Sequence, residues 1–249
     1  MKTIYLLRIN SKLRTRDDNP DDNGLIIDDI EIDEGKTKEI LLSYLPSFSN
    51  VTDILISPAL RAQQTAQVLL DLLKENKPGP RIKIEIGFSG FVKDEEKDPQ
   101  FATYRIRGKG LIAEGDYPNG VPTQNRWAGL FPGIDIETAD YWQMLKAFFE
   151  VGEQDFKPFW TAKRIGKRGA EALENALRSS KGDCIAISHS GVIEPTVACA
   201  LGVDINRVIE ALDDKKLDFL ESISLTYEQG EGFVEATIRE DKIKSRMQE

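Results

Sequence analysis

The chain has 249 residues, 40% of them hydrophobic and 30% charged, a composition that excludes a wholly disordered protein. Its formal net charge of −9 argues against broad binding to nucleic acid or to an anionic membrane surface. Two cysteines are too few for a disulfide framework, and no Cys/His spacing suits zinc. We expect neither a metal nor an organic cofactor, because arginines can supply the positive charge that a metal otherwise would. No stretch approaches the roughly 20 apolar residues that span a bilayer, and we expect a cytoplasmic protein.

The apolar pattern predicts strands and helices that alternate along most of the chain. In chain order the predicted elements are strand 4–7, helix 35–45, strand 53–57, helix 59–74, strand 81–86, helix 138–151, helix 161–179, strand 184–188, helix 192–201, and strands 220–227 and 233–238. Strands that alternate with helices favour a parallel α/β sheet. We therefore expect a single α/β domain over residues 1–249.

Residues 87–160 have the weakest pattern, and we interpret them as a loop-rich insert in this domain. Gly and Pro are frequent there, and the insert holds the chain's tryptophans, Trp127, Trp142 and Trp160. A long loop-rich insert with aromatic residues is typical of a lid or of a surface for a protein partner. The alternative is a small additional core beneath long loops.

Polar and basic residues follow three of the predicted strands. Arg8 follows strand 4–7, Ser57 ends strand 53–57 and Arg61 lies four residues beyond it, and His189 follows strand 184–188. Ligands of open α/β sheets bind beyond the carboxyl ends of the strands, where helix N-termini also attract anions. Two arginines and an imidazole at this edge predict a phosphate pocket, with Ser57 first a helix cap and second a phosphate contact. The structural alternatives are an ion pair for Arg8, a solvated side chain for Arg61 and a core residue for His189.

The same segments resemble the histidine phosphatase (phosphoglycerate mutase-like) superfamily. Residues 4–10, IYLLRIN, are similar to its first strand and Arg-His-Gly motif, and residues 185–193, IAISHSGVI, to the strand that ends in its second active-site histidine. Residues 57–66 match its signature Ser-Pro-x-x-Arg-x-x-x-Thr-Ala, the most specific of the three. The resemblance covers nearly the whole chain. It implies a three-layer α/β/α fold with a mostly parallel central sheet.

The chain departs from this family at three positions. The nucleophilic histidine that forms a phosphohistidine corresponds to Ile9, and the glycine after it to Asn10, which either fills the space or donates a hydrogen bond to an anion. Ile9 has no lone pair to attack phosphorus, and the single histidine of the chain is His189. The family's proton-donating acid falls on Gly90 in our alignment. Other carboxylates that can supply this acid are those of Glu85, Glu95, Glu96 and Glu114.

The resemblance and the departures together imply a phosphatase-like protein that keeps a phosphate pocket but is catalytically impaired, a pseudoenzyme. We expect a phospho-ligand binder or interaction module, whose partner is a phosphate-containing small molecule or a phosphorylated protein. One alternative is an active phosphomonoesterase that uses His189 or an activated water in an unconventional mechanism. The other is a structural subunit that binds a protein partner through the insert 87–160. The family's tendency to form dimers adds a homodimer to the expected partners.

Overall fold

The computed structural model of the chain describes residues 1–9, 32–57, 60–74, 79–85, 103–107, 110–114, 141–150, 162–213, 215 and 217–246. Within these residues, seven strands form one sheet and two more form a separate hairpin. The strands are β1 (Lys2–Arg8), β2 (Val51–Ile56), β3 (Arg81–Ile84), β4 (Thr103–Arg107), β5 (Gly110–Glu114), β6 (Asp183–Ser188), β7 (Ser222–Glu228), β8 (Gly232–Ile238) and β9 (Asp241–Lys244). The helices are α1 (Glu34–Tyr44), α2 (Leu60–Lys74), α4 (Tyr141–Glu150), α5 (Ala162–Ser179), α6 (Ile193–Leu201) and α7 (Ile205–Ala211), with a short 3-10 helix η2 (Leu45–Phe48).

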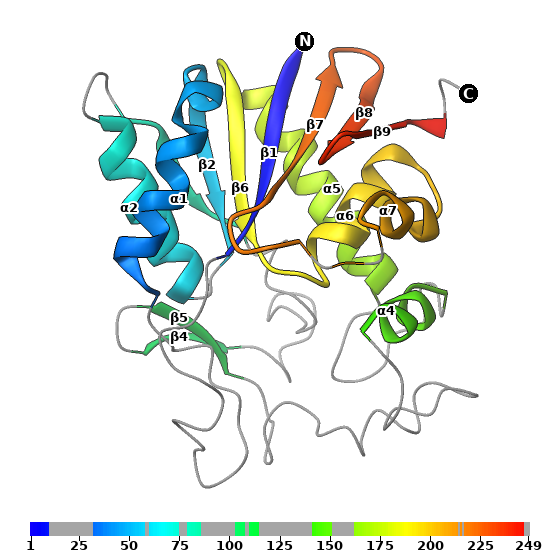
Figure 1. The fold of residues 1–249 in the computed structure, drawn as a ribbon, viewed down its shortest axis with the longest axis horizontal. Helices are drawn as coiled ribbons and strands as arrows, with labels where there is room; N and C mark the ends of the chain where they lie inside the picture. Colours follow the sequence, from blue (N-terminus) through cyan, green and yellow to red (C-terminus); the bar gives the residue numbers. More distant parts are fainter. Residues whose placement is uncertain are drawn as a thin grey trace, which may run out of the picture.

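The central sheet has the strand order β3-β2-β6-β1-β7-β8-β9 (Figure 1). Strands β3, β2, β6 and β1 are parallel to one another, whereas β7, β8 and β9 extend the sheet from β1 with antiparallel pairs. The parallel centre is apolar at nearly every position, because helices cover it on both faces. In β6, for example, every residue from Cys184 to Ser188 is buried. In β7 buried and half-buried residues alternate, as in a strand with one covered face.

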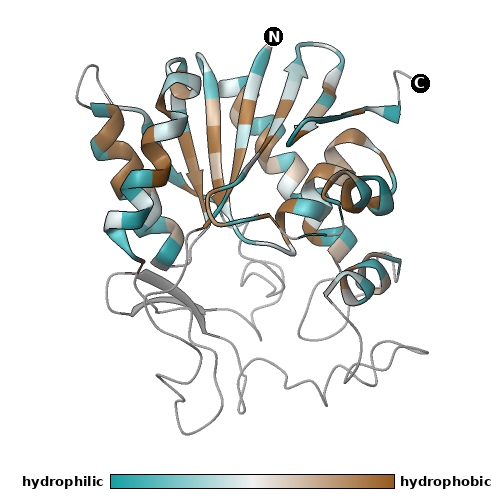
Figure 2. Cartoon of the chain, in the orientation of Figure 1, coloured by the Kyte–Doolittle hydropathy of each residue, from teal (hydrophilic) through white to brown (hydrophobic). Residues whose placement is uncertain are grey.

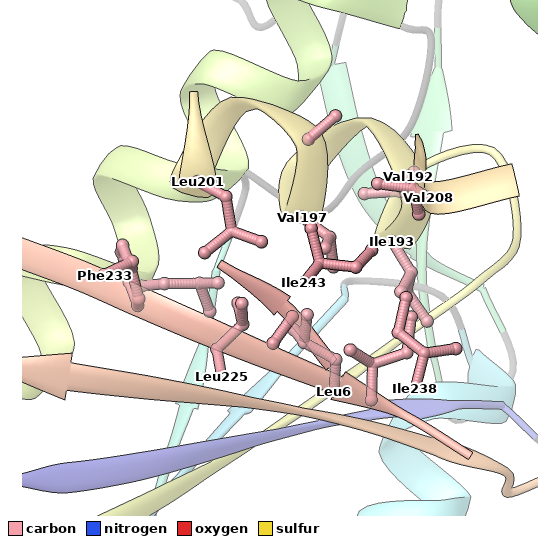
Figure 3. Packing of buried hydrophobic residues seen from close by; sticks show 14 of the residues in the cluster. Leu6, Val192, Ile193, Val197, Leu201, Val208, Leu225, Phe233, Ile238 and Ile243 are labelled. Carbon is pink, nitrogen blue, oxygen red and sulfur yellow. The ribbon is translucent and has the colours of Figure 1, made fainter. Parts of the chain in front are cut away.

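Helices cover both faces of the sheet, which confirms the predicted three-layer α/β/α fold (Figure 1). On one face α1 and α2 pack in an apolar cluster that contains Leu7 of β1, Ile54 of β2 and Ile187 of β6. On the other face α5, α6 and α7 share a larger cluster with the sheet, in which Leu6 and Leu225 lie beneath α6 (Figure 3). Hydrophobic residues accordingly lie along the central strands and the helices beside them (Figure 2).

The larger cluster is held together by a close approach of α5 to α6. A Cβ atom added at Gly166 would overlap the backbone of Pro195, and one at Gly169 would overlap the side chain of Thr196. Glycine at these two positions therefore lets the helix axes approach more closely than any other residue would. This contact places the N-terminal end of α6 firmly over the sheet.

Each strand and helix that the pattern predicts is present, with boundaries that agree to within a few residues. The sequence pattern missed α7, β9 and the β4–β5 hairpin. Of the insert 87–160, the described parts are this hairpin and α4, and both lie beyond the carboxyl ends of the parallel strands in Figure 1. Trp142 and Leu145 of α4 are buried in the larger cluster, whereas Trp127 and Trp160 lie outside the described residues.

Cys184 is buried in the sheet, whereas Cys199 of α6 is half-buried. Burial raises the pKa of the Cys184 thiol, and it raises that of Cys199 to about 11. Both thiols therefore stay protonated near neutral pH, and a protonated thiol is a poor nucleophile. Among the helices of the described ranges, none is long and apolar enough to cross a membrane.

Candidate functional site

The carboxyl ends of β2, β6 and β1 lie side by side, and the sequence-predicted residues follow them. Arg8 at the end of β1 is paired with Ser188 at the end of β6. Across the other side of β6, the Ser57 amide donates to the carbonyl of Ile187 at 2.9 Å. Because β6 lies between the other two strands, Ser57, Ser188 and Arg8 form a polar row along this edge, and His189 follows directly from it.

The side chain of Arg8 is held by the segment that precedes β7. Its guanidinium donates through Nη1 to the Leu217 carbonyl, and its Cζ lies 4.8 Å from the ring centre of Phe219. Its backbone is held as well, since the Arg8 carbonyl accepts from the Leu220 amide at 2.9 Å. The structure therefore places Arg8 in a defined orientation rather than in open solvent.

Arg61 reaches the same edge from the first turn of α2. It is 9% exposed, which is unusual for an arginine, whose charge needs oxygen acceptors or a counter-ion when it is buried. Its carbonyl accepts from the Thr65 hydroxyl at 2.7 Å, one turn further along the helix. The structural alternative, a solvated surface side chain, therefore does not describe Arg61. Because α2 covers the opposite face from α6, Arg61 and His189 approach the edge from different layers.

His189 begins a tight turn between β6 and α6. Its carbonyl accepts from the amides of Val192 and Ile193, and Gly191 has a φ of 85°, which favours glycine. The Gly191 amide donates to Oε2 of Glu194 at 2.7 Å, and Glu194 is fully buried. A buried carboxylate thus fixes the turn that carries His189, which is half-buried at the polar edge.

Ile9, which the motif resemblance aligns with the nucleophile, is buried in apolar surroundings. It is 3% exposed and belongs to the cluster between the sheet, α1 and α2. Strand alternation explains this placement, because Leu7 and Ile9 lie on the same face of β1 while Arg8 lies on the other. The Ile9 amide donates to the Ser188 carbonyl at 2.7 Å, which continues the β1–β6 pairing past the end of the strand.

Two hydroxyl groups near this edge are buried without a hydrogen-bond partner in the described part of the chain. They are the Oγ atoms of Ser188 and Ser190, on either side of His189. Ser188 is fully buried, and strand pairing puts its side chain on the same face as that of Arg8. A buried hydroxyl that makes no hydrogen bond costs about 1–3 kcal/mol, so these groups favour the arrival of an acceptor or donor.

Two of the predicted site residues, Asn10 and Gly90, lie outside the described residues, as do Glu95 and Glu96. Of the alternative acids, Glu85 follows β3, where its amide donates to the carbonyl of Ile56 at 2.8 Å. Its carboxylate lies 2.9 Å from Nζ of Lys83. Of Glu114 only the backbone, at the end of β5, is described. In the described ranges, no three His, Cys, Asp or Glu side chains gather as metal ligands would.

Sequence reasoning missed the residues that hold the site residues in place. The contact from Arg8 to Leu217 joins positions 209 residues apart, and no local pattern signals it. Glu194 did have a signal, because an acidic residue is favourable in the first turn of a helix. The structure therefore adds Leu217, Phe219 and Glu194 to the candidate site.

No protein-family model and no curated protein matches the sequence significantly. Solved structures do match. Phosphoserine phosphatase of Entamoeba histolytica in complex with 3-phosphoglyceric acid is 15% identical, with a TM-score of 0.53 over 94% of each chain. A mutant of that phosphatase, with one histidine replaced by alanine and phosphoserine bound, is 12% identical, with a TM-score of 0.50 over 94% of this chain and 96% of that one.

A third match is the mycobacterial glucosyl-3-phosphoglycerate phosphatase. It is 11% identical, with a TM-score of 0.55 over 92% of each chain. These neighbours belong to the histidine phosphatase superfamily, and the matches span nearly the full length of both chains. The chain therefore has the phosphoglycerate mutase-like fold of the histidine phosphatase superfamily, the family that its motifs resemble.

Proposed function

We propose that this protein binds a phosphate-bearing ligand at the edge formed by Arg8, Arg61 and His189, and that it does not hydrolyse phosphate esters by the phosphohistidine route. The observation that carries the proposal is a contrast at one sheet edge. Basic groups follow three adjacent strands there, yet position 9 is an isoleucine buried in an apolar cluster.

The charge and burial of Arg61 support the binding half of the proposal. A guanidinium presents N–H groups in a planar fork that matches phosphate oxygens, and it keeps its charge at any physiological pH. At 9% exposure, Arg61 is shielded from the solvent that would weaken an ionic hydrogen bond. His189 and the hydroxyl groups of Ser188 and Ser190 add donors at the same edge.

The isoleucine at the nucleophile position supports the second half. In enzymes that depend on a covalent intermediate, removal of the nucleophile lowers the rate by about a millionfold. Binding does not need that group. A histidine-to-alanine mutant of the Entamoeba phosphatase has been crystallised in complex with phosphoserine. We infer that the same separation of binding from catalysis applies here.

The ligands named for the neighbours suggest which class of ligand this protein binds. They are 3-phosphoglyceric acid, phosphoserine and a glucosylated phosphoglycerate, all small phosphate monoesters. We therefore expect a small metabolite with a phosphate monoester, and we expect α4 and the β4–β5 hairpin, beyond the strand ends, to limit its size.

The test is a calorimetric titration with inorganic phosphate and 3-phosphoglycerate. Hydrogen bonds to charged groups contribute about 1.5–3 kcal/mol, so Arg61→Ala should weaken Kd by about 10- to 100-fold. The matched control is Arg81→Ala. It removes the same charge from an exposed arginine that pairs with Asp53 at 2.6 Å, at the amino ends of the strands. It should leave Kd unchanged.

Hydrolysis of an aryl phosphate is measured on the same samples, and the expected rate is that of buffer. Equal affinity in Arg61→Ala and Arg81→Ala would move the binding site elsewhere. Strong turnover that survives Ile9→Val but disappears in His189→Ala would overturn the second half of the proposal. That result would instead support a phosphomonoesterase that uses His189.

A further inference from the structure

The segment before β7 contains an unfavourable backbone conformation, which the surrounding contacts must stabilise. Leu220 is a fully buried non-glycine residue with a φ of 63°, a left-handed conformation that such residues adopt rarely. Its amide donates to the Arg8 carbonyl at 2.9 Å, and the Arg8 amide donates to the Glu221 carbonyl at 3.2 Å. The unfavourable backbone conformation thus occurs where the segment pairs with the end of β1.

An ion pair holds the same segment from its other side. The Glu221 carboxylate accepts from Nε of Arg239 at 2.7 Å and from the Asp218 amide at 2.6 Å. Arg239 also donates to the Leu212 carbonyl at 2.6 Å, and the hydrogen bond to Glu221 raises its pKa. Residues 217–221 are therefore tied to the end of β1, to the residue after β8 and to the end of α7.

Phe219 occupies the middle of this segment, and its ring is only partly covered. It is 39% exposed, and the guanidinium of Arg8 lies above the ring with Cζ at 4.8 Å from the centre. The ring face is the negative end of its quadrupole and attracts a cation at this distance. The Leu217 carbonyl accepts one of the five N–H donors of Arg8 and fixes the in-plane rotation.

We propose that residues 217–221 form a clamp that orients Arg8 for anion binding, with Phe219 as the positioning residue. An arginine side chain on a surface has many rotamers, and it loses this freedom when it binds a ligand. A guanidinium held between a ring face and a carbonyl has lost that freedom already on folding, so binding becomes tighter. This inference rests on the proposed phosphate site and concerns Arg8 alone.

The experiment is a double-mutant cycle between Phe219 and Arg8, read as the Kd for inorganic phosphate by phosphorus NMR, which also reaches weak affinities. Without the ring Arg8 must be ordered on binding, at a cost bounded by the energy of the exposed cation–π contact, so Phe219→Leu should weaken Kd about two- to fivefold. Phe219→Tyr keeps the ring face and should bind like the unmodified protein. In an Arg8→Ala background, Phe219→Leu should change nothing further. The matched control is Ile82→Ala, at an equally exposed apolar position on β3.

The outcomes separate this inference from the proposed function. If Phe219→Leu weakens binding equally with and without Arg8, the ring acts on the ligand or on the fold, and the clamp is refuted. Unchanged affinity in Phe219→Leu, or in Arg8→Ala, refutes the clamp as well. A strong effect of Arg61→Ala in the same measurements would still support the proposed phosphate site. If the unmodified protein binds no phosphate, both the site and the clamp fail.

Discussion

Ile9→His places an imidazole at the position that the motif resemblance aligns with the nucleophile, and the surroundings of Ile9 predict a large loss of stability. The side chain is 3% exposed and packs with the apolar cluster beneath α2. Losing a buried aliphatic side chain costs about 1.5–3 kcal/mol. Burying a polar ring without a hydrogen bond costs about 1–3 kcal/mol more. We therefore expect the free energy of unfolding to fall by about 3–5 kcal/mol and Tm to fall by roughly 10 °C.

The destabilisation should also depend on pH. An imidazole in apolar surroundings has a lowered pKa in the folded state, whereas in the unfolded state it titrates at about 6.5. Below that value the unfolded state binds more protons than the folded state, so stability rises with pH. Urea unfolding should thus show a larger loss for Ile9→His at about pH 5.5 than at about pH 8. The control Ile9→Val keeps an apolar side chain and should cost about 0.5–1.5 kcal/mol at both pH values.

The catalytic outcome depends on the same placement. An imidazole drawn into the apolar cluster is away from the polar edge, so Ile9→His alone should not produce a phosphatase. Aryl phosphate hydrolysis is measured beside the unfolding curves. If Ile9→His is as stable as Ile9→Val at both pH values, or if it gains turnover through a phosphohistidine, the reasoning from burial is refuted.

Two further variants test the packing and the buried hydroxyl. Gly169→Ala places a methyl group against Thr196 and should cost about 1–3 kcal/mol in urea unfolding, with partial recovery when Thr196→Ala is added. Ser188→Ala removes a buried hydroxyl without a partner in the described residues, so it should keep or raise stability while weakening phosphate binding about two- to tenfold in calorimetry. Ser245→Ala, whose buried Oγ likewise has no partner in the described part of the chain, lies at the amino end of β8 and should leave phosphate affinity unchanged.

The parallel centre of the fold was predictable because its sequence obeys one physical rule throughout. A strand with helices on both faces must be apolar on both, and residues 4–7 of β1 and 184–187 of β6 have this pattern without interruption. The elements that were missed lack such a signal. β9 has one buried side chain, Ile243, among three exposed ones, and α7 has only seven residues, too few for a clear helical period.

The candidate site was predictable in its position and less so in its orientation. The rule that ligands bind beyond the carboxyl ends of strands brought Arg8, Arg61 and His189 to one edge. Strand alternation was also available in the sequence, and it would have put Ile9 on the face of Leu7. The contacts that hold Arg8 could not be predicted from the sequence. Leu217 and Phe219 lie just before β7, and they reach Arg8 only because β7 pairs antiparallel with β1.

The direction of the outer strands has a practical consequence. β1 starts at the edge of the sheet opposite the candidate site, and β9, antiparallel to β8, runs back to that same edge (Figure 1). The start of β1 and the end of β9 therefore both lie away from the strand carboxyl ends. A purification tag or fluorescent fusion at either terminus would therefore sit remote from Arg8 and His189. Protein immobilised through such a tag would present the candidate site to the solution, which suits a surface-based screen of phosphorylated metabolites as ligands.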